Sequence, residues 1–287
     1  MPKRARFALR VNDLASSLTF YVERLGFQLV ESQLDADRAV VLDPYGDPIF
    51  LAGPAVEDVQ SHLDEPRIVY KPGQTLDFVQ ENLDARLAAL TERGLTAIRQ
   101  EQTDEGDRKL TIKDPSNSTI IFVQQRSPEK TLALYTRGGD DVEAALAELS
   151  EADFDLTRAP GQWSIRQIVH HLAEMEALHL MIFASALAQS GSTFIRNPYD
   201  QDHWVEALAY NERAIEPSVA LIKASRRYIA HLFQHIPDHW DRYLLMKFAN
   251  WEGEGDKVTV GAFLDGLNWH FADHCAEIRE IRRIHRR

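Results

Sequence analysis

Two histidines stand four residues apart near the end of the chain, in the sequence NWHFADHCAEI. On an α-helix, positions i and i+4 lie on one face, so His270 and His274 can share one divalent metal ion. A three-ligand metal site would then need a third side chain from another helix. The candidate stretch is 163–174, WSIRQIVHHLAE, which contains His170 and His171. A site built from two such distant helices constrains the second half of the chain to a helix bundle.

Four segments of the second half carry apolar residues at helical spacing, which predicts a four-helix bundle. Three of the four segments begin with a polar side chain that can accept hydrogen bonds from the first free backbone N–H groups of a helix. The expected helices begin at Asp140–Asp141, run from Ser164 to about Gln189, span about 203–235, and begin at Thr259. Pro217 falls inside the third segment, where it can kink the helix.

Two motifs of this half match a known family. One is the run 160–165, PGQWSI, which leads into His171-Leu172-Ala173, and the other is His270 and His274 followed by Ile278. Over roughly 160 residues the sequence resembles the DinB/YfiT-like superfamily, which includes bacillithiol transferases and mycothiol-dependent maleylpyruvate isomerases. The resemblance implies a metal triad of His171, His270 and His274, because the family's upstream ligand directly precedes Leu-Ala.

The ligand types agree with that triad. Imidazole suits zinc, nickel and iron(II). Three protein ligands leave coordination positions open for water and substrate, which is typical of a catalytic rather than a structural site. We therefore expect one divalent metal, zinc, nickel or iron, in the bundle.

The first half repeats one pattern of strands and a helix. Each copy has a helix that ends at a glycine, Gly26 or Gly94, and these glycines are 68 residues apart. Each copy also has an Asp-Pro turn, at Asp43 or Asp114, and these turns are 71 residues apart. Two landmarks at nearly the same offset indicate an internal duplication. The expected strands are 6–11, 27–31, 39–42, 49–52, 76–80, 109–112 and 119–123.

Several short motifs of this half point to a second family. They are the run 9–14, LRVNDL, the pair Phe20-Tyr21, the run 25–27, LGF, and the two Asp-Pro turns. Roughly the first 126 residues resemble the vicinal oxygen chelate superfamily, which includes glyoxalase I, bleomycin-resistance proteins and ring-cleaving dioxygenases. The resemblance implies paired βαβββ modules that form a curved sheet around a cleft.

The sequence departs from that family where a metal would bind. Metal-bearing members place a His or Gln at the start of each module's first strand and a Glu four residues after the turn glycine. Here the first strand opens with Arg6-Phe7, and the two later positions are Phe50 and Ile121. Apolar side chains cannot ligate a metal, so we expect this domain to act as a binding cleft or a dimerising scaffold without a metal.

The chain as a whole is expected to form two domains. Its 287 residues suit a glyoxalase/bleomycin-resistance-like α+β domain over 1–126 and a DinB-like, all-α metal-binding bundle over 127–287. The single cysteine, Cys275, excludes an intrachain disulfide. The net charge of −12 argues against nucleic acid as a partner. The sequence has no run of about 18 apolar residues and no signal-peptide pattern, so we expect a cytoplasmic protein without a membrane partner.

These features favour a metal-dependent enzyme of the thiol-transferase type. The metal would bind a low-molecular-weight thiol and lower its pKa, so that the thiolate attacks an electrophile. The same metal could activate water for hydrolysis, and the sequence does not separate the two. The alternative is a small-molecule binding or resistance protein that uses the N-terminal cleft, with an incidental or structural metal in the bundle. We also expect a homodimer, because domains of paired modules commonly associate.

Overall fold

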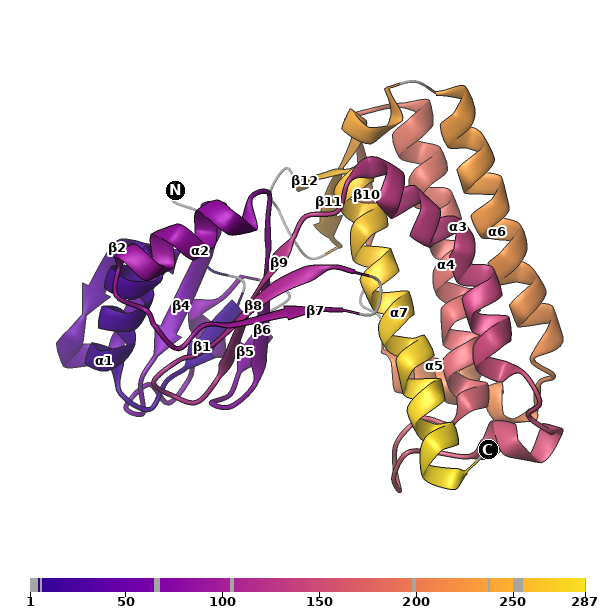
Figure 1. Ribbon diagram of the computed structural model, residues 1–287, viewed down its shortest axis with the longest axis horizontal. Coiled ribbons are helices and arrows are strands. Elements are labelled where there is room, and N and C mark those ends of the chain that lie inside the picture. The colour runs from indigo at the N-terminus through magenta and orange to yellow at the C-terminus, as the bar shows by residue number, and fades with distance from the viewer. Residues whose placement is uncertain are drawn as a thin grey trace. The chain divides into compact units, whose positions relative to one another are not determined.

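Strands dominate the first part of the chain and long helices the second (Figure 1). The computed structural model describes residue 5 and residues 7–64, 68–103, 106–197, 200–236, 238–249 and 255–286. The chain divides into two compact units, Met1–Gln125 and Arg126–Arg287. The predicted fold class, an α+β domain of paired modules followed by a four-helix bundle, is confirmed.

The first unit contains two βαβββ modules with the same strand order. The first consists of β1 (Phe7–Arg10), α1 (Leu14–Leu18) with the π-helical turn Thr19–Arg24, β2 (Gln28–Gln33), β3 (Arg38–Leu42) and β4 (Pro48–Ala52). The second consists of β6 (Thr75–Gln80), α2 (Leu83–Glu92), β7 (Arg99–Gln102), β8 (Arg108–Lys113) and β9 (Thr119–Gln124). The sheets run β2-β3-β4-β1 and β7-β8-β9-β6, and in each the first strand of the module pairs in parallel with the last.

The two modules meet through side chains rather than through one continuous sheet. Their inward faces form one core, which includes Leu9 and Val41 from the first module and Leu110 and Phe122 from the second. The buried Tyr21 hydroxyl donates a hydrogen bond to Asp114, 2.9 Å away, and so ties the first helix to the second Asp-Pro turn. Among the described strands, the expected curved sheet is therefore two sheets, of five and four strands.

Two strands of this unit were not predicted from the sequence. β5 (Ile68–Tyr70) pairs in parallel with β1 at the edge of the five-stranded sheet, but three residues are too few to show an alternation. β7 has the sequence RQEQ, which has no apolar residue, and its side chains are mostly exposed. An edge strand needs no apolar face of its own, since its backbone pairing holds it in place.

Four helices of the second unit lie side by side (Figure 1). They are α3 (Pro128–Leu146), α4 (Ile165–Ala188), α6 (Glu216–His235) and α7 (Val260–His285). Ser164 caps α4 and Thr259 caps α7, each by accepting a hydrogen bond from the third residue that follows. Both predicted starts are therefore confirmed. Within the described ranges, every helix is too short or too polar to cross a membrane.

The predicted first helix of the bundle was wrong at its start. Asp140 and Asp141 lie inside α3, which begins at Pro128 after its cap Ser127. The run Gly138-Gly139 is unfavourable in a helix, by about 1 kcal/mol for each glycine. A methyl group at Gly138 would collide with the Arg226 guanidinium of α6, so close packing of the neighbouring helix requires glycine here.

The predicted third helix is two helices. α5 (Gln201–Ala207) is separated from α6 by the short turn Tyr210–Glu212, and Pro217 lies in the first turn of α6. Proline is tolerated there because the first N–H groups of a helix have no intrahelical acceptor, so it starts this helix instead of kinking it. The bundle also carries an unpredicted sheet of β10 (Ser192–Arg196), β11 (Tyr243–Phe248) and β12 (Asp256–Thr259). Pro237, which follows the predicted third helix in the sequence, lies outside the described residues.

Candidate metal centre

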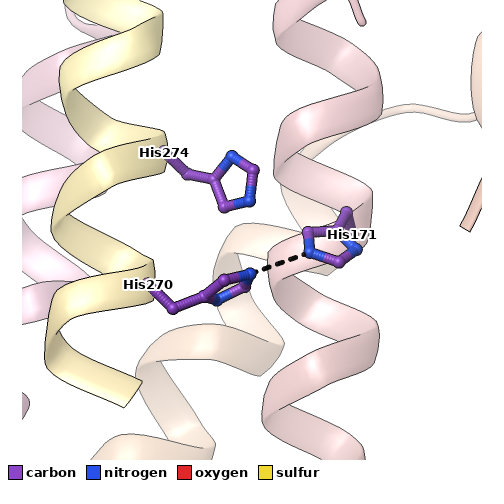
Figure 2. Close-up of side chains that lie close together, drawn as sticks. All are labelled: His171, His270 and His274. Atoms are coloured by element: carbon purple, nitrogen blue, oxygen red, sulfur yellow. Dashed lines mark hydrogen bonds between the residues drawn. The ribbon is translucent and has the colours of Figure 1, made fainter. Parts of the chain in front are cut away.

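The helices α4 and α7 bring three histidines together. His171 lies in the second turn of α4, and His270 and His274 lie on consecutive turns of α7. Figure 2 shows the three rings pointing toward one another in the space between the two helices. The helix pattern alone placed His270 and His274 on one face, and the packing of α4 against α7 supplies His171.

The three rings are close enough to share one ion. The Nε2 atoms of His171 and His270 are 3.2 Å apart. One ligand nitrogen from each of the three residues can be chosen so that all lie within 4.8 Å of one another. Nitrogen ligands lie about 2.0–2.1 Å from a zinc ion, so two of them are at most about 4.2 Å apart, and the 3.2 Å between His171 and His270 falls within that limit.

Burial keeps the three rings in the form that binds metal. His171 is fully buried, and the other two are partly buried. Burial lowers the pKa of His171 to about 3, and the neighbouring His274 and His270 add to the effect. Burial likewise lowers the pKa of His270 and of His274 to about 4 each. All three are therefore neutral at pH 7, and a metal need not displace a proton to bind.

Glu277 orients the His274 ring. It lies one turn after His274, and its carboxylate is 3.3 Å from Nδ1 of that histidine. A neutral imidazole has one N–H, so a proton on Nδ1 that is donated to Glu277 leaves the Nε2 lone pair available to a metal. Glu277 was not among the site residues predicted from the sequence, although it stands three residues after His274.

Trp163 covers the site from the loop before α4. Its ring lies nearly parallel to that of His274, with centroids 6.3 Å apart, and meets His171 edge-on at 5.0 Å. The indole N–H donates a hydrogen bond to Asp202 of α5, 2.9 Å away. Trp163 was part of the motif used for the family resemblance, but no local pattern could reveal its partner on α5.

The neighbouring His170 serves another purpose. Its Nδ1 lies 2.8 Å from the Ser218 hydroxyl, and its Nε2 lies 3.2 Å from the carbonyl oxygen of Arg213. The carbonyl can only accept, so Nε2 carries the proton and Nδ1 accepts from Ser218. Adjacent helix positions differ by about 100° in direction, which is why His170 binds α6 while His171 faces α7.

Two other polar residues near the triad have structural roles. Glu174 forms an ion pair with Arg213 at 3.4 Å. Cys275 is 2% exposed, and burial raises the pKa of its thiol to about 12. This thiol is therefore not a nucleophile at neutral pH.

The second unit is a helix bundle that contains a cluster of three histidines. The model of the DinB superfamily matches residues 134–278, and the chain belongs to that superfamily. Residues 3–122 match the model of the Glyoxalase/Bleomycin resistance protein/Dioxygenase superfamily. The two-domain fusion predicted from the sequence is thereby confirmed.

Curated relatives match the second half of the chain. A protein of Oceanobacillus iheyensis named "Putative metal-dependent hydrolase" is 26% identical over 135 residues, which are 47% of this chain and 73% of that protein. A protein of Bacillus licheniformis with the same description is 27% identical over 171 residues, 58% of this chain and 91% of that protein.

Solved structures are similar to each half. YfiT from Bacillus subtilis, described as a probable metal-dependent hydrolase with an unusual four-helix bundle topology, is 22% identical with a TM-score of 0.48. It covers 55% of this chain and 89% of its own. A glyoxalase/bleomycin resistance protein from Catenulispora acidiphila is 25% identical with a TM-score of 0.32, over 42% of this chain and 98% of its own.

Proposed function

We propose that the second unit is the catalytic part of a metal-dependent enzyme. In this proposal His171, His270 and His274 hold one divalent ion, zinc, nickel or iron, and the enzyme acts on a small electrophilic substrate. It either transfers a low-molecular-weight thiol to that substrate or hydrolyses it. The observation that carries the proposal is the cluster of three neutral imidazoles from two helices, with ligand nitrogens within 4.8 Å.

The cluster fits a cation better than it fits any other partner. At most one proton can lie between the Nε2 atoms of His171 and His270, which are 3.2 Å apart. The three imidazoles would each give a lone pair to a divalent cation, and a water or thiol bound to that cation would have its pKa lowered to near neutrality. Three ligands leave room for that nucleophile and for substrate.

The side chains around the triad position the site and limit its chemistry. Glu277 holds the His274 ring in one orientation, and the Trp163 ring, fixed by Asp202, lies against His274 and His171. Because the only cysteine of the chain is buried, with a pKa of about 12, an attacking sulfur would come from a second substrate. The names of the curated relatives support hydrolysis, and the thiol reaction rests on the resemblance to thiol transferases.

The test uses the full chain purified without a polyhistidine tag. Elemental analysis should find about one divalent metal per chain, and His274→Gln should lose it. The matched control is His235→Gln, which replaces an exposed histidine of α6. Each protein is then assayed for thiol conjugation to a chlorodinitrobenzene and for hydrolysis of a nitrophenyl ester, with products identified by mass.

Each outcome has a defined meaning. Metal-dependent turnover in either assay, lost in His274→Gln and kept in His235→Gln, supports the proposal and selects the reaction. A chain that stays metal-free after incubation with zinc, nickel and iron(II) contradicts it. Metal binding without either activity would favour the alternative of a small-molecule binding protein.

A further inference from the structure

The first unit contains a cavity that the metal chemistry does not use. Its volume is about 260 Å³, enough for a small organic molecule. It is lined by the start of β1, the turn after β3, the end of β5 and the strand β6. The lining residues are Phe7, Asp43, Tyr45, Tyr70, Leu76, Asp77, Phe78 and Val79.

Half of the lining residues are aromatic. Phe7 and Tyr70, on paired strands, meet edge-to-face with centroids 5.9 Å apart. Phe78 is buried, at 5% exposure, whereas Tyr45 is 55% exposed and stands on the turn after β3. Aromatic faces carry negative electrostatic potential, so rings gathered around one space attract a cation.

The charged lining residues are both acidic. Asp43 uses a single oxygen, Oδ1, to accept hydrogen bonds from the backbone N–H groups of Tyr45 and Asp47, at 2.8 and 2.9 Å. Burial raises the pKa of the Asp43 carboxyl, which is the cost of holding a carboxylate at a partly desolvated position. A bound cation would offset that cost.

The surrounding charge is also negative on balance. Burial raises the pKa of the Tyr45 hydroxyl, and the negative charges of Glu81 and Asp43 raise it further, while Arg86 opposes them. Arg86 stacks on the ring of Phe122 at 4.2 Å, and neither residue lines the cavity. Residues 1–125 contain 20 Asp and Glu against 14 Lys and Arg, so the field of this unit favours cations.

We propose that this cavity binds a small organic cation, a quaternary ammonium or a protonated amine. The aromatic rings would face its alkyl groups, and Asp43 would supply the opposite charge. This site is independent of the metal centre, since every lining residue belongs to the first unit. The first unit would therefore bind an organic cation, which is a different ligand from the electrophilic substrate proposed for the bundle.

A pair of isosteric probes tests the cation directly. Choline and 3,3-dimethylbutan-1-ol have the same shape, but only choline carries a charge. Isothermal titration of the full chain should show choline binding at one site, on the order of tenfold more tightly than the alcohol. Equal affinities, or no choline binding at about 10 mM, would overturn the proposal.

Conservative variants test the two features of the cavity separately. Asp43→Asn keeps an oxygen for the turn hydrogen bonds but removes the charge, and it should weaken choline binding on the order of tenfold. Tyr70→Leu should weaken it while Tyr70→Phe keeps it, because only the first removes the ring. The control Asp35→Asn removes an exposed charge of the same unit outside the cavity and should change nothing. Parent-like choline affinity in both Asp43→Asn and Tyr70→Leu would place the ligand elsewhere.

Discussion

Acid should destabilise the metal-free second unit, and His171 should account for a defined share of the loss. Burial lowers the pKa of this histidine to about 3 in the folded chain, whereas a histidine in an unfolded chain titrates near 6.5. Between these pH values the unfolded chain binds a proton that the folded chain does not. The stability contributed by the neutral ring is therefore fully present above about pH 6.5 and is lost as the pH falls toward 3.

The size of the effect follows from the number of protons. One extra proton on the unfolded state lowers the free energy of unfolding by about 1.4 kcal/mol for each pH unit. For His171 the loss between pH 6.5 and pH 5 is about 2 kcal/mol. Burial also lowers the pKa of His270, His274 and the nearby His179, so these residues contribute with the same sign.

Tryptophan fluorescence can follow the second unit alone within the full chain. All five tryptophans lie between residues 163 and 269. Urea unfolding in the presence of a chelator should be measured at several pH values from 7 to 5 for the parent and for His171→Gln. The variant should lose about 2 kcal/mol of the change in stability between pH 7 and pH 5, and the control His235→Gln should lose none of it. If His171→Gln shows the same pH dependence as the parent, His171 is not held neutral by burial and the reasoning fails.

Three further predictions concern the metal site and assembly. His270→Ala or His274→Ala should abolish metal binding, while His171→Ala should leave weak binding without activity, because His270 and His274 form a pair arranged on one helix. Calorimetric metal titration of the three apo variants measures this. Parent-like affinity in both α7 variants would place the site elsewhere. Glu277→Gln should weaken metal binding by about tenfold, whereas Glu280→Gln, an exposed partner of Arg283, should not, and equal affinities would remove Glu277 from the site. The full chain should associate, so light scattering should give a mass above 32.7 kDa, and a monomer throughout a dilution series would exclude self-pairing.

Local sequence patterns were enough to locate several elements of this protein. Ser164 and Thr259 cap α4 and α7 because a polar side chain and the next three residues suffice to satisfy the first N–H groups. The repeat of glycine and Asp-Pro landmarks revealed the duplication, because turns demand particular residues wherever they occur. The spacing of His270 and His274 placed them on one face of a helix, and the structure shows this face turned toward α4 (Figure 2).

Other features depend on residues that are distant in the sequence, and these could be seen only in the folded chain. Gly138 and Gly139 look like a helix end until the side chains of α6 are seen packed against them. Backbone pairing holds the polar strand β7 in place, and the partner of Trp163 lies 39 residues away on α5. Likewise, the cavity beside Asp43 and Tyr70 joins segments from both modules. Such contacts follow from how elements pack, and packing depends on shapes and charges that no short stretch of sequence contains.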